Sequence, residues 1–170
     1  MNMAKNLEIE KKFIIEYPDL DRIMSMPECS YTDIEQIYLA GSEGKSERIR
    51  KRGINNNFKY YHTVKYHVTA MTRVEEERFI SVEEYSELSK RADNSLNIIY
   101  KTRYCFPYEG HNIEIDVFPF WKKQAYLEVE LDSEDEEFAI PDFIKCVRDV
   151  TFEPIYTNRA LAQQIPCETL

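Results

Sequence analysis

Alternation of polar with apolar or aromatic residues is the main pattern along this chain. Because successive side chains of a β-strand point to opposite faces, this alternation predicts strands with one charged face and one apolar face. Five segments carry it: Leu7–Glu10, Glu47–Arg50, Thr63–Tyr66, Asn112–Val117 and Leu127–Leu131. Adding Gln36–Leu39, Arg73–Ile80 and Ile98–Cys105 gives about eight strands. Their spacing suits hairpins, so we predict a mainly β fold of the α+β class, an eight-stranded antiparallel closed barrel.

Helical signals interrupt the strands. Asp19–Met26 has apolar residues on one side, Ser81–Ala92 begins with a Ser N-cap, and Pro141–Val150 combines Pro in its first turn with an apolar stripe. Tyr156–Gln164 is a shorter fourth segment. Apolar stripes must be buried, and the apolar faces of the strands offer the surface. We therefore expect the helices outside the barrel and the charged strand faces inside it.

Composition narrows the class of protein. The 170 residues fit one domain, residues 1–170, and the net charge of -9 argues against a nucleic-acid or anionic-membrane binder. No apolar run is long enough to span a membrane, and Met1–Leu7 lacks the apolar core of a signal peptide, so a cytoplasmic location is expected. The four cysteines form no C-x-x-C pair, which signals neither a zinc site nor a disulfide framework.

Charged residues two apart share a strand face, and the resulting pairs are sorted by sign. The ordinary alternative to charges inside a barrel is that these residues lie on the solvated outer faces of a β-sandwich. Like charges side by side cost free energy unless something compensates them, which favours a bound ion or anion instead. The acidic pairs are Glu8 with Glu10, Glu75 with Glu77, Glu114 with Asp116 and Glu128 with Glu130, and the basic pairs are Arg48 with Arg50 and Lys101 with Arg103.

An interior with both signs of charge suits metal-dependent phosphate chemistry. Lysines and arginines in a poorly solvated space bind a compact polyanion such as a chain of phosphates. Carboxylates supply the hard oxygen ligands that Mg²⁺ or Mn²⁺ prefers. In phosphoryl transfer the protein mainly positions groups and neutralises charge, while a carboxylate, or a Lys with a lowered pKa, activates the attacking water.

The order of these motifs resembles the CYTH domain family, the triphosphate tunnel metalloenzymes. Glu8-Ile9-Glu10-Lys11-Lys12 matches the N-terminal E-x-E-x-K signature. The later motifs follow in the family's order: Arg48-Ile49-Arg50, Thr63-Val64-Lys65, Arg73-Val74-Glu75-Glu76-Glu77, Lys101-Thr102-Arg103-Tyr104, Glu114-Ile115-Asp116 and Glu128-Val129-Glu130-Leu131. The closing segment Tyr156–Ala162 also resembles that of short bacterial members.

The resemblance implies a role for each matching residue. Those expected on the phosphates are Lys12, Arg48, Arg50, Lys65, Arg73, Lys101 and Arg103. Those expected on one or two Mg²⁺ or Mn²⁺ ions, or on the attacking water, are Glu8, Glu10, Glu75, Glu77, Asp116, Glu128 and Glu130, with Glu114 as a supporting partner. Glu8, Glu10 and Lys12 are the expected catalytic residues. Phe118–Lys123 departs from the family, whose members often have a Gly-containing hairpin there.

The predicted function is hydrolysis of a small-molecule triphosphate, either inorganic triphosphate or a nucleoside or thiamine triphosphate. Two alternatives stay open. One is a class IV-type adenylate cyclase, which resembles the same fold and makes cyclic AMP from ATP. The other is a module that binds polyphosphate without catalysis, although simple anion capture needs no metal ligands. The expected partner is the substrate rather than a nucleic acid or a membrane, and a homodimer is compatible with the sequence.

Overall fold

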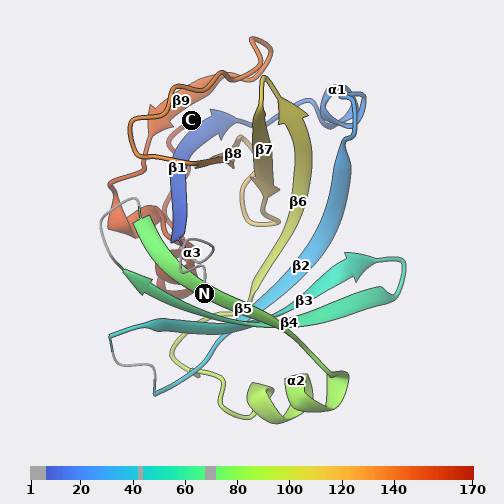
Figure 1. Cartoon of the computed structure of the whole chain (residues 1–170), viewed down its shortest axis with the longest axis vertical. Helices are drawn as coiled ribbons and strands as arrows, with labels where there is room; N and C mark the ends of the chain where they lie inside the picture. Colours follow the sequence, from blue (N-terminus) through green and yellow to red (C-terminus); the bar gives the residue numbers. More distant parts are fainter. Residues whose placement is uncertain (1–6, 42–43, 68–71) are drawn as a thin grey trace.

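A closed antiparallel β-barrel forms the body of the computed structural model, which describes residues 7–41, 44–67 and 72–170 (Figure 1). The strand order is β5-β4-β3-β2-β6-β7-β8-β1, and β1 pairs back onto β5. The barrel strands are β1 (Leu7–Glu16), β2 (Ser30–Tyr38), β3 (Ser46–Ile54), β4 (Asn57–His67), β5 (Thr72–Ile80), β6 (Ile99–Tyr108), β7 (His111–Val117) and β8 (Gln124–Leu131). The predicted fold class is confirmed.

Strand register brings opposite charges together. Arg103 on β6 pairs directly with Asp116 on β7, and Lys65 on β4 pairs with Glu75 on β5. Residues directly opposite each other in an antiparallel pair share a face, so each base lies beside an acid of the neighbouring strand. Among the described residues, β1 and β5 close the barrel by pairing from Leu7 to Ile9 of β1.

Two apolar clusters lie outside the barrel. Helix α1 (Leu20–Met24) packs Ile23 on the outer faces of β6, β7 and β8, and helix α2 (Val82–Ser89) packs Tyr85 on Leu39 and Ile49. Both helices begin at an N-cap that accepts a backbone N–H, Asp19 for α1 and Ser81 for α2. The expectation of helices on the outside is therefore confirmed for α1 and α2.

A third apolar cluster lies inside the barrel, on the same strand faces as the charged residues. Ile14 lies two residues after Lys12 on β1, and Tyr126 lies two before Glu128 on β8, so both share the charged face. Tyr156 of the short 3₁₀ helix η2 (Pro154–Tyr156) and Leu161 of α3 (Asn158–Gln163) pack on them. The C-terminal segment thus covers part of the interior.

The prediction of a helix over Pro141–Val150 is wrong. This segment is a loop followed by strand β9 (Cys146–Asp149), which pairs with β1 from Phe13 to Ile15. β8 occupies one edge of β1, and on the other edge β9 supplies hydrogen-bond partners for the backbone groups from Phe13 to Ile15. The apolar residues that suggested a helical stripe do not share one face, because Ile144 packs in the cluster of Ile23 and Val147 is exposed.

None of the helices in the described ranges is long and apolar enough to cross a membrane.

Candidate active site

The charged strand faces converge on a cavity of about 150 Å³ inside the barrel. Its lining consists of Glu8, Glu10, Arg48, Arg50, Arg52, Lys65, Glu75, Glu77, Lys101, Arg103, Glu114, Glu128, Glu130 and Asn158. Lys12 and Arg73 line the space that continues it on one side, and Asp116 is buried behind it against Lys101 and Arg103. The structure therefore brings every residue expected on phosphate or metal to one interior.

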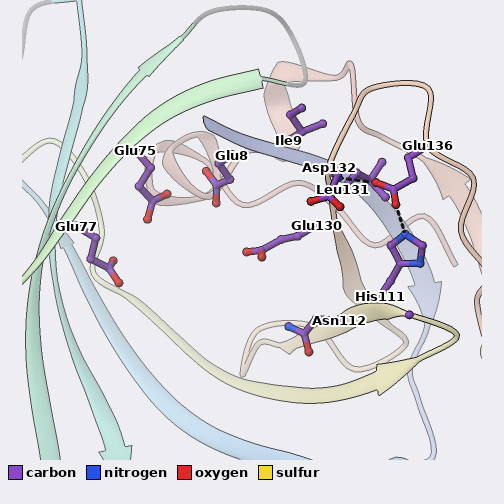
Figure 2. A pocket seen from close by; sticks show the side chains of 11 residues that line it. Glu8, Ile9, Glu75, Glu77, His111, Asn112, Glu130, Leu131, Asp132 and Glu136 are labelled. Atoms are coloured by element: carbon purple, nitrogen blue, oxygen red, sulfur yellow. Dashed lines mark hydrogen bonds and ion pairs between the residues drawn. The ribbon is translucent and has the colours of Figure 1, made fainter. Parts of the chain in front are cut away.

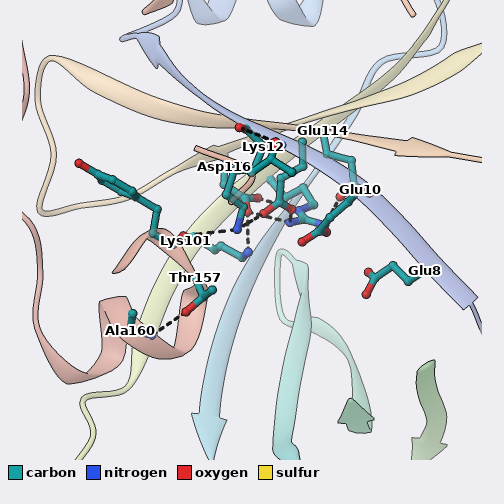
Figure 3. Close-up of polar contacts among 12 residues, drawn as sticks. Glu8, Glu10, Lys12, Lys101, Glu114, Asp116, Thr157 and Ala160 are labelled. Atoms are coloured by element: carbon teal, nitrogen blue, oxygen red, sulfur yellow. Dashed lines mark hydrogen bonds and ion pairs between the residues drawn. The ribbon is translucent and has the colours of Figure 1, made fainter. Parts of the chain in front are cut away.

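Arg103 is the centre of a buried ion-pair network. Its Nε lies 2.6 Å from Asp116 Oδ1, and its Nη2 lies 2.6 Å from Glu128 Oε2. Lys101 Nζ lies 2.6 Å from Asp116 Oδ2, and Lys12 Nζ lies 2.7 Å from Glu128 Oε1. Figure 3 shows Lys12, Lys101 and Asp116 gathered in this network. Asp116 on β7 and Glu128 on β8 are thus held by bases from two other strands, β6 and β1.

These neighbours change the pKa values of the network. Burial raises the pKa of Asp116, but the charges of Arg103 and Lys101 outweigh it and hold that pKa below its ordinary value. Burial lowers the pKa of Lys101 to about 8, with Arg103 adding to the effect and Asp116 opposing it. For Lys12, burial is outweighed by Glu128 and Glu10, so its pKa is raised. Lys12 therefore stays protonated at neutral pH, whereas the pKa of Lys101 lies about one unit above it.

The bases on the other side of the cavity are also paired. Lys65 Nζ lies 2.5 Å from Glu8 Oε2 and 2.5 Å from Glu75 Oε2. Arg73 Nη1 lies 2.5 Å from Glu10 Oε1. Arg50 and Glu77 form an ion pair, and Thr63 Oγ1 donates a hydrogen bond of 2.7 Å to the same Glu77. The carboxylates expected to bind the metal ion thus form ion pairs with the lysine and arginines expected to bind phosphate.

Arg48 is different, because in the described part of the chain no carboxylate forms an ion pair with it although it is only 7% exposed. Within those same ranges, Arg48 Nε, Arg50 Nε and Asn158 Oδ1 are buried without a hydrogen-bond partner. A buried polar atom left unpaired costs about 1–3 kcal/mol, so such atoms indicate a polar ligand or water. All three residues line the same cavity, where phosphate oxygens could accept from the two guanidinium groups.

Carboxylates dominate the wider opening of the interior, a space of about 570 Å³. Figure 2 shows Glu8, Glu75, Glu77 and Glu130 pointing into it from β1, β5 and β8. Across residues 7–41, 44–67 and 72–170, no Lys, Arg or His forms an ion pair with Glu130. Partial burial and the neighbouring charges of Glu114 and Glu8 raise its pKa to about 7.

The donor set at this opening fits a hard divalent cation. Among the described residues, no group of three or more His, Cys, Asp or Glu side chains is already arranged to hold a metal ion. Oxygen donors are nevertheless what Mg²⁺ and Mn²⁺ prefer, and Glu130 is a carboxylate that pairs with no cationic side chain among the described residues. Glu8 and Glu75 face the same space, so these three residues are the ones that would hold an ion there.

Two lining residues were missed by sequence reasoning. Arg52 continues the alternation of Arg48 and Arg50 along β3, so the same period-two signal could have found it. Asn158 comes from α3, far along the chain, and carries no charge pattern. Only the resemblance of Tyr156–Ala162 to the ends of short bacterial proteins pointed towards it.

Comparisons with known proteins agree with this geometry. No family model matches the chain. The inorganic triphosphatase of Acetivibrio thermocellus is 34% identical over 160 residues, which cover 92% of this chain and 93% of that protein. The crystal structure of the inorganic triphosphatase NE1496 superimposes with a TM-score of 0.59 at 29% identity, covering 94% of this chain and 97% of the other. A putative adenylyl cyclase from Hippeastrum, described as having a dominant triphosphatase activity, matches 73% of this chain and 79% of its own with a TM-score of 0.51; at 16% identity it shows the fold alone.

Proposed function

This chain belongs to the CYTH, or triphosphate tunnel, family, and on that premise we propose that it hydrolyses inorganic triphosphate with Mg²⁺ or Mn²⁺ as cofactor. The observation that carries the proposal is the buried Arg48, which lines a cavity crowded with charge and has no carboxylate partner among the described residues. A buried guanidinium that no carboxylate contacts directly keeps donors available for phosphate oxygens. The relatives named inorganic triphosphatases support the choice of substrate.

The bases bind and orient the phosphate chain in this proposal. Arg48 and Arg50 can each offer several donors to phosphate oxygens, and Lys12, Lys65, Arg73, Lys101 and Arg103 surround them. Lys12 stays protonated because its pKa is raised, so it neutralises charge that develops on the phosphates and does not take a proton from water.

The carboxylates at the wider opening hold the cofactor and the water. Glu8, Glu75 and Glu130 would hold the cation, with Glu10 and Glu77 beside them. A divalent ion, when bound, neutralises phosphate charge and polarises the bond that breaks. A carboxylate beside the ion, Glu10 or Glu77, can orient the attacking water. Asp116 and Glu128, which are bound to Arg103 here, position the bases from behind.

Phosphate release from a panel of triphosphates tests this function. Inorganic triphosphate, ATP and thiamine triphosphate are each incubated with the enzyme under Mg²⁺ and under Mn²⁺, and then with EDTA. We expect the highest kcat/KM for inorganic triphosphate and no turnover with EDTA. Absence of turnover with every substrate would refute the proposal.

The same samples separate the two alternatives. Chromatography of the ATP digest detects cyclic AMP, whose formation would identify a cyclase. Calorimetry with inorganic triphosphate detects binding, and binding without hydrolysis would identify a module that only captures polyphosphate.

A further inference from the structure

The C-terminal segment brings two polar side chains to the basic end of the interior. Asn158 lines both the central cavity and a neighbouring cavity of about 110 Å³, and Arg159 lines the second. Lys12, Arg48, Lys65 and Arg73 line this second cavity too, and among the described residues Glu10 is its only carboxylate. This cavity is thus predominantly basic, whereas the wider opening is lined by carboxylates. The interior has two ends of opposite charge.

The segment that carries these side chains is firmly attached to the barrel. Leu161 and Ala162 of α3 are fully buried, and Ala162 O accepts a hydrogen bond of 2.8 Å from Asn97 N. Thr157 Oγ1 accepts a hydrogen bond of 3.1 Å from Ala160 N, so that backbone donor is already used. Figure 3 shows this Thr157–Ala160 bond below the ion-pair network. The segment therefore presents the side chains of Asn158 and Arg159 from an anchored position.

Neither side chain is fully used by the protein. Asn158 Oδ1 is buried without a hydrogen-bond partner in the described ranges, and an amide group can turn to present its NH₂ donor instead. Arg159 reaches Asp93 only at 3.8 Å, and its guanidinium carbon lies 5.5 Å from the centre of the Tyr38 ring. Tyr38 lines the same cavity as Arg48. Both residues therefore have hydrogen-bonding capacity left at the basic end.

We propose that Asn158 and Arg159, together with Arg48, form a subsite for the free terminal phosphate and so determine substrate specificity. The proposal rests on the proposed function. A terminal phosphate carries up to two negative charges and a bridging one carries a single charge, so the basic end favours a free terminus over an esterified one. The rest of the chain then extends towards the carboxylate-lined opening, where a cation can bridge it to Glu8 and Glu130.

Binding and kinetics with three ligands test the subsite. Inorganic triphosphate and ATP each have a free terminal phosphate, whereas diadenosine triphosphate has the same phosphate chain without one. Calorimetry with Mg²⁺ should detect binding of the first two to the wild-type protein and at least tenfold weaker binding of the third. Equal affinity for ATP and diadenosine triphosphate would overturn the proposal.

Three variants locate the effect. Arg159→Ala and Asn158→Asp should each raise the KM and the dissociation constant for inorganic triphosphate by about tenfold or more, with a smaller change in kcat, because each removes or opposes a contact to a charged ligand. Asp suits the first turn of a helix, so Asn158→Asp should keep the fold. Arg78→Ala is the matched control, since Arg78 pairs with Glu84 on the exposed surface. Wild-type KM and affinity in both subsite variants would contradict the assignment.

The readouts also separate this proposal from the proposed function. If the wild-type protein binds triphosphate without hydrolysing it, the proposed function fails, and the affinities of the variants still decide the subsite. If it hydrolyses triphosphate and the variants behave like the wild type, only the subsite fails. A wild-type protein that binds no triphosphate would refute both.

Discussion

Arg103 is the side chain on which most of the buried carboxylates depend. It forms ion pairs with Glu114, Asp116 and Glu128 and is itself 8% exposed. Burying a carboxylate without a partner costs far more than an intact ion pair contributes. The position of Arg103 opposite Asp116 could be expected from alternating charges, but its three partners depend on strand register, which the local pattern does not specify.

Replacing Arg103 should therefore destabilise the fold as well as the site. We expect Arg103→Met to lower the free energy of unfolding by about 3–5 kcal/mol, because two carboxylates on β7 and one on β8 lose their shared cation. Urea denaturation measures the change. Arg78→Ala, on the exposed surface, should leave the midpoint almost unchanged. A stable Arg103 variant would show that the network does not hold the barrel together.

The pKa of Lys101 gives the site a pH dependence. With a pKa lowered to about 8, Lys101 is charged below that pH and neutral above it. Its contribution to triphosphate binding is present at pH 7 and lost as pH rises through about 8. KM for inorganic triphosphate, measured between pH 6.5 and about 9.5, should rise across that range.

Lys101→Met provides the control for this titration, since Asp116 keeps Arg103 as a partner. The variant should have a higher KM at pH 7 and should lose the rise near pH 8, while any change of KM from the substrate's own ionisation remains. An unchanged pH profile in the variant would assign the titration to another group.

At the scale of elements, the strands follow from sequence better than the C-terminal third does. The eight segments predicted as strands correspond to β1 to β8, in which one face meets helices or loops and the other meets charges. Pro141–Val150 has helical signals, yet part of it forms β9 because its backbone pairs with an edge of β1. Which segment lies beside that edge is a long-range property of the fold. Local periodicity cannot reveal it.

Helix α3 is short, so its stability depends on packing. Leu161 is completely buried against the cluster that includes Tyr126 and Trp121. Leu161→Ala should lower the free energy of unfolding by about 2–5 kcal/mol and weaken triphosphate binding, because the segment carrying Asn158 becomes less fixed. Denaturation and calorimetry measure the two effects. Phe152→Ala is the control, since Phe152 is 65% exposed; equal effects in both variants would contradict the role of α3.

At the scale of the whole molecule, most charged side chains of the interior form ion pairs with one another. Lys65 lies between Glu8 and Glu75, and Arg73 pairs with Glu10, so groups for the cation and groups for the anion are joined before any ligand arrives. Phosphate must displace carboxylates from these bases, and the released carboxylates then need a cation. Binding of triphosphate and of Mg²⁺ should therefore be coupled, each strengthening the other.

Calorimetry checks this coupling directly. We expect triphosphate alone and Mg²⁺ alone to bind weakly, and each to bind at least about fivefold more tightly when the other is present. Glu130→Gln should reduce the coupling, because it removes the carboxylate that lacks a cation partner in the described part of the chain. Independent binding of the two ligands would contradict the picture of exchanged ion pairs.

The most direct test of the account is the rate of phosphate release from inorganic triphosphate by Arg48→Met. Arg48 lines the interior cavity and forms no ion pair with a carboxylate in the described ranges, so its removal leaves no buried acid unpaired. We predict a folded protein with the unfolding midpoint of the wild type and a kcat/KM lowered by about a hundredfold or more. Wild-type kcat/KM in this variant would show that triphosphate is not hydrolysed inside the barrel.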